Sequence, residues 1–333
     1  MVSTGIKNRL NFIDVAKGIG IILVVLGHLN SAEQPVRNFI YSFHMPFFFV
    51  VSGMFFSEKT DFKTLFIKSV KTLLVPYLIF IAVDALVYMA MNSFTTDSVI
   101  FALKTRLLSA TGLRLRITNL PIWFLFALFI IRLIYHFISK NKYAEIIFVA
   151  TGVLLTALAP YLWYPPKCMY IVALPCLVFY SLGHRMKNYI INIDNVKFNF
   201  VNAVIILIVA VGLYFSSNYN YCINMYSYKY GNFLLFYLNG ILGSGILLVL
   251  SSWLNRIEKL SVPLIYYGRS SVVILTWHYY MCRIVLPNIM SALGLGQYLY
   301  SYLTQIIVLL CVLLIMIPIE KISGRYLGFV YGK

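Results

Sequence analysis

Long apolar runs, separated by short polar segments, recur along the whole chain. A helix needs about 20 apolar residues to cross the hydrocarbon core of a bilayer. Ten runs approach that length, at residues 12–30, 36–56, 65–91, 118–138, 144–163, 169–185, 198–216, 232–253, 262–286 and 300–320. They predict an all-α, polytopic integral membrane protein with about ten transmembrane helices. Because no long polar linker interrupts them, residues 1–333 are expected to form a single membrane domain without an appended soluble domain.

The positions of the basic residues predict how these helices are oriented. Ten spans place both termini on the same side of the membrane. If that side is the cytoplasm, 19 of the 27 Lys and Arg residues lie inside and 8 lie outside, which is the usual bias of membrane proteins. We therefore expect both termini in the cytoplasm and a multi-pass protein of the cytoplasmic (inner) cell membrane. Residues 104–116 depart from the bias, and they would form either an amphipathic surface segment or part of a site.

Composition supports the membrane interpretation and argues against other classes. Only 11% of the residues are charged and 61% are hydrophobic, with a mean hydropathy of +0.85, whereas soluble domains have about 25% charged residues. The formal net charge is +17, but no long basic stripe of the kind that binds nucleic acid is present. We expect contacts with membrane lipid and no nucleic-acid partner. The five cysteines form no C-x-x-C pair, so no metal site is predicted.

The first predicted span carries an unusual number of ionisable residues. Asp14, Lys17 and His28 lie within it, and Glu33 follows its outer end. Ionisable residues inside a span are costly and are usually functional. At about 100° per residue, Lys17 and His28 share one helix face and lie about 16 Å apart along the axis. Asp14 lies one turn before Lys17, close enough to pair with it.

Less specific explanations stay open for the same residues. Asp14 and Lys17 lie near the cytoplasmic interface, where they could reach water and only orient the helix. His28 should lie in the outer half of the membrane, where a neighbouring group could satisfy it without any catalytic role. Gly18 and Gly20 would allow another helix or a ligand to approach this helix closely.

The second predicted span and the segment after it add three candidates. His44 is followed by Pro46, which bends a helix and frees a backbone carbonyl. His44 could handle a proton, orient His28 or be a structural residue of the interface. Lys68 and Lys71 are one turn apart. They could clamp the phosphates of a cytosolic cofactor, or provide only topogenic charge and contacts to lipid headgroups.

Later spans carry weaker signals. Asp84 lies in the middle of the third span and needs a partner that the sequence does not identify. Trp123 begins the fourth span, where Trp is usually part of an interfacial belt. In the ninth span Ser271 precedes His278, which would lie near the middle of the membrane. Five tyrosines between residues 219 and 230 would form either an interfacial belt or a stacking platform for sugar rings.

Taken in order along the chain, these motifs resemble the signature of acyltransferase family 3. The matching stretches are Asp14-x-x-Lys17-Gly18, Gly27-His28, Phe43-His44-Met45-Pro46, Ser52-Gly53, Lys68-x-x-Lys71, Trp123-Phe124-Leu125 and Gly268-x-x-Ser271 followed by His278. Lys17 and His28 match the family's pattern of a basic residue, ten residues and a histidine. The chain departs from the family at Lys68 and Lys71, because arginines are more typical there. No single motif is decisive, but their order and spacing cover most of the chain.

The resemblance implies a membrane O-acyltransferase that takes an acyl group from cytosolic acyl-CoA, usually acetyl-CoA. The acceptor would be a hydroxyl of a cell-surface or precursor carbohydrate. His28 is then the catalytic base, since an alcohol must lose its proton as it attacks a thioester, and the ordinary pKa of histidine suits that task. Lysines in place of arginines would still attract the donor's phosphates, but they lose bidentate recognition.

The resemblance also distributes roles among the remaining candidates. The catalytic candidates are His28, Lys17, His44 and Glu33. The candidates for holding the donor are Lys17, Lys68, Lys71 and Asp14. The candidates for binding the acceptor are Trp123, His278 and Ser271.

Two other functions remain open from the sequence. A transporter or exporter of a glycan or lipid-linked sugar would also need intramembrane charges and a cavity, but it would not need a cytosolic basic clamp. An inactive relative could serve as a scaffold. If the chain is an enzyme, a separate outer transferase partner could complete the transfer.

Overall fold

The computed structural model describes residues 10–29, 34–113, 116–161, 168–221, 223–296 and 302–331. These ranges contain α-helices joined by short turns and no β-strand. The helices are α1 (Asn11–His28), α2 (Gln34–Met54), α3 (Phe62–Ser69), α4 (Val75–Met91), α5 (Thr96–Ala110), α6 (Trp123–Ile138), α7 (Lys142–Leu158), α8 (Met169–Arg185), α9 (Lys187–Asn192), α10 (Phe200–Tyr219), α11 (Phe233–Asn255), α12 (Glu258–Arg269), α13 (Ser271–Tyr280), α14 (Leu286–Ala292) and α15 (Tyr302–Tyr326).

Short π-helical and 3₁₀ segments connect some of these helices. π-Helical turns at Val70–Leu74 and Met281–Val285 join α3 to α4 and α13 to α14. A 3₁₀ turn at Leu120–Ile122 leads into α6. A second one at Met225–Ser227 lies in the segment between α10 and α11.

Seven helical segments of the described chain are long and apolar enough to cross a membrane. A bent pair, Met169–Arg185 with Lys187–Asn195, makes eight if it forms one span. Two of the ten predicted spans are not among these. Residues 36–56 form α2, whose first turns carry polar and charged side chains, and residues 262–286 are divided among α12, α13 and a π-helical turn. The all-helical class is confirmed, and the candidate spans suggest a multi-pass membrane protein. The total of about ten spans and the orientation of the termini remain predictions.

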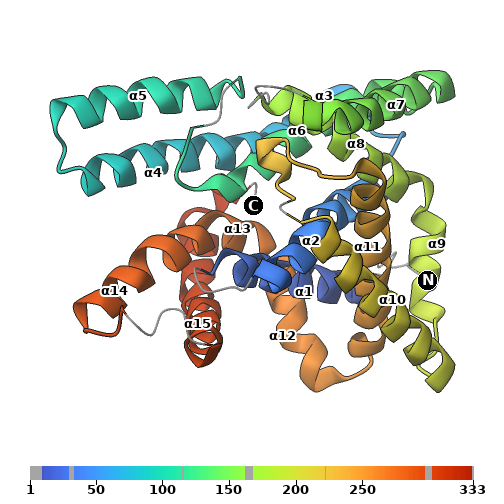
Figure 1. The fold of residues 1–333 in the computed structure, drawn as a ribbon. Coiled ribbons are helices and arrows are strands. Elements are labelled where there is room, and N and C mark those ends of the chain that lie inside the picture. Colours follow the sequence, from blue (N-terminus) through green and yellow to red (C-terminus); the bar gives the residue numbers. More distant parts are fainter. Residues whose placement is uncertain are drawn as a thin grey trace, which may run out of the picture.

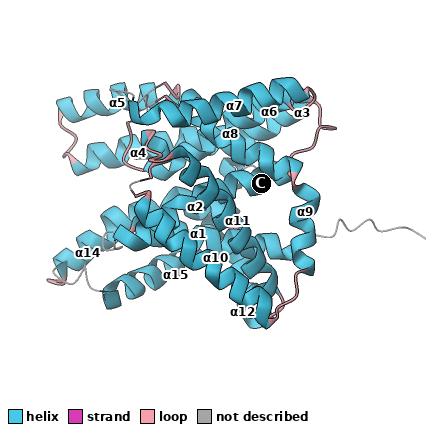
Figure 2. Cartoon of the chain, turned by 45° about the vertical axis from the view of Figure 1, so that its right-hand side comes forward, coloured by secondary structure: helices cyan, strands magenta, loops and turns pink. Residues whose placement is uncertain are grey.

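α1 and α2 lie at the centre of the helical assembly (Figure 1). α1 packs against α12, α11, α2 and α13, and α2 packs against α8, α11 and α10. α4 and α5 form an antiparallel hairpin that projects to one side, and the view turned by 45° shows the same arrangement (Figure 2). The two helices with the densest set of candidate residues therefore lie at the centre of the assembly.

Glycines allow the central helices to approach their partners at two crossings. At the crossing of α1 and α12, a Cβ on Gly18 would overlap the carbonyl oxygen of Leu264, and one on Gly268 would overlap that of Asp14. The crossing of α2 and α8 repeats the arrangement, with a glycine on each helix facing the other's backbone. Small residues serve this purpose in membrane helices, because close backbone approach replaces the missing hydrophobic drive.

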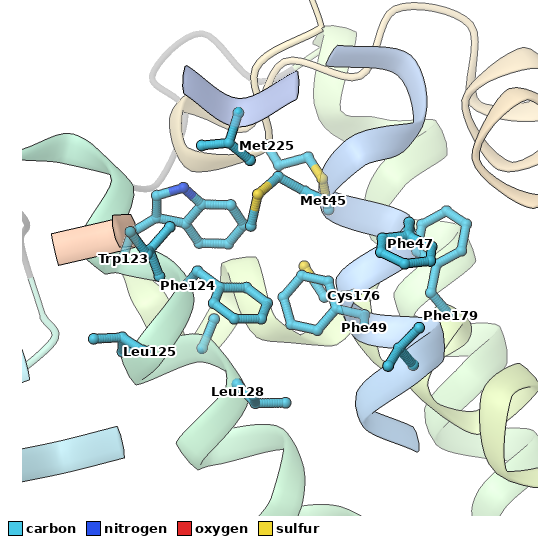
Figure 3. Close-up of a cluster of buried hydrophobic side chains, with 14 of the residues drawn as sticks. Met45, Phe47, Phe49, Trp123, Phe124, Leu125, Leu128, Cys176, Phe179 and Met225 are labelled. Carbon is cyan, nitrogen blue, oxygen red and sulfur yellow. The ribbon is translucent and has the colours of Figure 1, made fainter. Parts of the chain in front are cut away.

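Aromatic side chains fill the space between α2, α6 and α8 (Figure 3). The rings of Phe49 and Phe124 lie 4.9 Å apart between their centroids, and Phe49 is 6.2 Å from Trp123. Met45 and Trp123 belong to the same cluster. This cluster fixes the positions of α2 and α6 relative to each other, and both helices contribute to the cavity described below.

Replacing Gly183 of α8 by alanine should destabilise the protein. Its Cβ would overlap the backbone carbonyl of Val50 on α2, and overpacking of this kind costs about 1–3 kcal/mol. The matched control is Gly212→Ala on α10, since Gly212 has no neighbour within 4 Å of an added Cβ. Thermal unfolding in detergent should show a lower midpoint for Gly183→Ala only. Equal midpoints for the two variants would show that the α2–α8 crossing does not depend on this glycine.

Candidate active site

A cavity of about 380 Å³ opens beside the C-terminal end of α1. Its walls come from α1, α2, the 120–123 segment, the 223–229 segment and the α13–α14 region. The polar side chains that line it are His28, Gln34, Arg37, Asn38, Tyr41, His44, Asn224, Tyr226, Lys229, Tyr279 and Arg283. This volume lies within the range of small-molecule sites, about 300–1,000 Å³.

His28 is the last residue of α1 and is half-buried at the cavity wall. The Tyr41 hydroxyl lies 3.1 Å from the carbonyl oxygen of Gly27 and 3.3 Å from Nδ1 of His28. A hydroxyl has one proton, and a carbonyl can only accept it. If Tyr41 donates to Gly27, its oxygen is left to accept from Nδ1–H of His28. This assignment places the lone pair of the neutral imidazole on Nε2.

His44 and His278 surround His28 and are held in a similar way. Nδ1 of His44 lies 2.8 Å from the carbonyl oxygen of Ile40, and Nδ1 of His278 lies 2.8 Å from that of Ile274. Since a carbonyl only accepts, both Nδ1 atoms carry protons. The His278 and His28 rings lie 5.3 Å apart between centroids, and Nε2 of His278 is buried without a hydrogen bond to any described residue. Within the described ranges, no three His, Cys, Asp or Glu side chains form a group suited to a metal ion.

Aromatic side chains complete the wall around His28. The ring of Tyr279 meets that of His28 edge to face at 5.4 Å between centroids. Trp123, with Leu120 and Pro121, lines the cavity from the start of α6. The five tyrosines between residues 219 and 230 lie in different surroundings. Tyr226 lines the cavity, while Tyr219 and Tyr221 are exposed. The other two are buried.

Asp84 fixes the segment that leads to Trp123. Its carboxylate accepts hydrogen bonds from Nε and Nη2 of Arg106 at 3.0 and 2.8 Å. It also accepts from the backbone N–H groups of Thr118 and Asn119 at 3.0 and 2.9 Å, and from the Tyr280 hydroxyl at 3.3 Å. One buried carboxylate thus joins α4, α5, α13 and the turn before α6.

The partner that Asp84 needs therefore comes from the basic segment 104–116. Arg106 lies on α5, with its guanidinium 4.6 Å from the ring centroid of Tyr88. The Asn119 side chain donates to the carbonyl of Thr276 at 2.7 Å, which ties the same turn to α13. Within the 104–116 segment, Arg106 is thus the ion-pair partner of Asp84 inside the helical assembly.

A second set of candidates lies at the opposite end of α1. Nζ of Lys17 is 3.4 Å from the Asp14 carboxylate, as the helical spacing predicts. The other carboxylate oxygen is 3.2 Å from Nε of Arg269 at the end of α12. Ser271 begins α13 two residues later and is buried there. This ion-pair cluster joins α1 to α12, and sequence reasoning did not identify Arg269.

The cavity does not join the two ends of α1. It reaches Val24 but not Lys17, and Ile21 and Val24 on the intervening face are buried. Lys68 and Lys71 lie on the exposed surface of α3 and the following π-helical turn, outside the cavity. Glu33 lies outside the described residues.

The structure thus brings together some of the predicted site residues and separates the others. His28, His44 and Trp123 line one cavity, and His278 packs beside it; Asp14, Lys17, Lys68, Lys71 and Ser271 lie elsewhere.

Sequence reasoning missed several polar members of the cavity wall, and four of them lie close in sequence to predicted histidines. Arg37 and Tyr41 precede His44 at helical spacing, which places all three on one face of α2. Tyr279 and Arg283, one helical turn apart, directly follow His278. Their proximity in sequence to the predicted histidines was the signal that could have identified them.

Comparison with known proteins identifies the family of the chain. The chain matches the model of an acyltransferase domain family, acyltransferase family 3, over residues 10–320. The chain therefore belongs to acyltransferase family 3, a family of acyltransferase domains. It is also similar to Nodulation protein NolL of Sinorhizobium fredii (strain NBRC 101917 / NGR234), with 41% identity over 78 residues, which are 20% of this chain and 21% of that protein. No solved structure matches the chain.

Replacing Asp84 by asparagine should destabilise the protein strongly. The change removes the counter-charge of a buried arginine, and breaking a buried pair costs about 3–5 kcal/mol. Asp97→Asn is the matched control, because Asp97 lies exposed on α5 of the same hairpin. The thermal midpoint should fall for Asp84→Asn and stay unchanged for Asp97→Asn. Similar midpoints would mean that Arg106 does not depend on Asp84.

Proposed function

We propose that this acyltransferase moves an acyl group, by preference acetyl, from cytosolic acyl-CoA to a hydroxyl of a cell-surface or precursor carbohydrate. The observation that carries the proposal is His28, whose ring faces a cavity while its Nδ1 lies within hydrogen-bonding distance of the Tyr41 hydroxyl. Nε2 would then be the base. The acceptor hydroxyl would lie in the cavity and lose its proton to Nε2 as its oxygen attacks the thioester carbonyl. The C–S bond of the thioester would then break, and the CoA sulfur would leave as the thiol after taking the proton back from the His28 imidazolium.

The surroundings of His28 suit this role. Arg37 and Arg283 line the same cavity as His28, and a nearby positive charge favours the neutral imidazole, which is the form that accepts a proton. His44 also lines the cavity and holds its Nδ1 proton against a backbone carbonyl, so its Nε2 carries a lone pair that could bind a hydroxyl proton. Trp123 supplies an aromatic face of the kind on which sugars stack.

The donor would approach from the other end of α1. Lys68 and Lys71 are exposed and could attract the phosphates of acyl-CoA. Lys17 lies on the face of α1 that leads towards His28, and its ammonium group forms an ion pair with Asp14. Because Ile21 and Val24 fill that face, a pantetheine arm running along it would have to displace their side chains. The inner membrane is the expected location, where a cytosolic donor could meet an outward acceptor.

Replacing His28 by alanine should lower acyl transfer by about 10²- to 10⁴-fold, the contribution of a positioned general base. The measurement is acetyl transfer from labelled acetyl-CoA to the surface glycans of the host, read by mass as added acetyl groups. His136→Gln is the control, since His136 lies on α6 and does not line the cavity. Full activity of a correctly folded His28→Ala protein would exclude His28 as the base. Sugar counterflow without any acyl transfer would favour a transporter.

Tyr41→Phe tests the proposed tautomer of His28. The variant keeps the ring and removes the hydroxyl beside Nδ1, so transfer should fall by roughly tenfold, in line with the loss of one hydrogen bond. The apparent KM for acyl-CoA should change little, because Tyr41 lies at the acceptor end of α1. An unchanged rate would show that Tyr41 does not orient the base.

A further inference from the structure

The charged side chains that line the cavity all have the same sign. Three cations line it: Arg37 from α2, Lys229 from the 223–229 segment and Arg283 from the π-helical turn after α13. No Asp or Glu is among the described residues of its wall. The described residues that line the cavity of the proposed base therefore carry positive charge only.

Arg37 is only partly used by the protein. One of its terminal nitrogens donates to the carbonyl of Leu29 at 3.1 Å, which ties the start of α2 to the end of α1. Its Nε is buried and has no hydrogen-bond partner among the described residues. A guanidinium has five N–H donors in a planar fork that fits a carboxylate or a phosphate. The geometry leaves donors that can face a ligand in the cavity.

Arg283 lines the cavity from the π-helical turn after α13. Its guanidinium lies 6.0 Å from the ring centroid of Tyr279, and that ring packs against His28. Both arginines are close enough for their charges to act on the ring of His28 and on Tyr41. An anion held between them would therefore lie beside the proposed base.

Two further cations extend the positive region towards the rim. Lys229 is held in place by backbone hydrogen bonds with Asn224 at 2.8 and 2.9 Å. Burial raises the pKa of Tyr226 in the same segment, and the positive charge of Arg116 opposes that shift. The side chain of Arg116 is exposed. Its positive charge therefore adds to the part of the cavity wall that Tyr226 forms.

Arg37 differs from the arginines that lie at other helix contacts. Arg106 pairs with Asp84, Arg185 with Glu145, and Arg269 with Asp14. A cation in a low-dielectric region is costly unless a counter-charge accompanies it. Arg37 has no such carboxylate partner among the residues that the structure describes.

We propose that the acceptor is an acidic carbohydrate, whose carboxylate or phosphate group binds between Arg37 and Arg283. This inference rests on the proposed function and names the substrate class. The anionic group would anchor the sugar, so that a hydroxyl of the same or a neighbouring ring lies at Nε2 of His28. Lys229 would attract the acidic chain at the mouth, and Trp123 would contact the sugar ring.

The test is a binding measurement on the purified full chain in lipid nanodiscs. The probes are methyl β-glucuronide, glucose 6-phosphate and the neutral methyl β-glucoside, followed by saturation-transfer NMR titration. The acidic sugars should bind at least about tenfold more tightly than the glucoside, which corresponds to one charge-assisted hydrogen bond. Comparison of glucuronide with glucose 6-phosphate tells whether a carboxylate or a phosphate is preferred.

Variants connect the preference to the two arginines. R37Q and R283Q should each remove most of the preference for acidic sugars while leaving the weak binding of the glucoside unchanged. R37K should restore part of it, because the charge returns without the fork. K140Q removes the same charge at an exposed position outside the cavity and should keep the full preference.

Three results would overturn the inference: equal affinities for acidic and neutral sugars, an acidic preference that survives in the R37Q/R283Q double variant, or displacement of the glucuronide by CoA. The last would assign these cations to the donor. Binding needs no acyl donor, so this measurement is separate from the proposed function. Acyl transfer to neutral sugars without acidic preference refutes the inference alone, and acidic binding without any acyl transfer refutes the proposed function alone.

Discussion

The architecture depends on the need of each buried carboxylate for a cation in a region that water does not screen. Asp84 is fully buried and takes both its charge partner and its backbone donors from segments far away in sequence. Asp14 joins α1 to α12 through Arg269, and Glu145 joins α7 to α8 through Arg185. Since a helix assembly in lipid gains little from hydrophobic burial between helices, such pairs act together with close glycine and aromatic packing where these helices meet.

The Asp84 cluster also determines the shape of the cavity. The carboxylate holds the backbone at Thr118 and Asn119, and these residues lead directly to the wall formed by the 120–123 segment. The same cluster reaches α13 through the Tyr280 hydroxyl, and α13 carries His278 beside His28. A structural ion pair thus connects two walls of the proposed acceptor site.

Local features of this arrangement were predictable from the sequence, and its long-range contacts were not. The Asp14–Lys17 pair follows from helical spacing, and His28 and His44 share a cavity because α1 and α2 are consecutive and packed together. The need of Asp84 for a partner was also predictable. That Arg106 would meet it, that Arg269 would meet Asp14, and that His278 would lie against His28 depends on tertiary packing between distant segments. The span at 262–286 was predicted as continuous because hydropathy does not register the break at Ser270 or the π-helical turn.

The central claim is that acyl transfer takes place in the cavity beside His28. The most direct measurement is an experimental structure of the full chain with a non-hydrolysable analogue of acetyl-CoA. The account predicts that the acyl carbonyl lies in this cavity, where an acceptor hydroxyl at hydrogen-bonding distance from Nε2 of His28 would be about 3–3.5 Å from the carbonyl carbon. It also predicts that the side chains of Ile21 and Val24 are displaced. An acyl group bound outside the cavity, with those side chains unmoved and no opening towards His28, would contradict it.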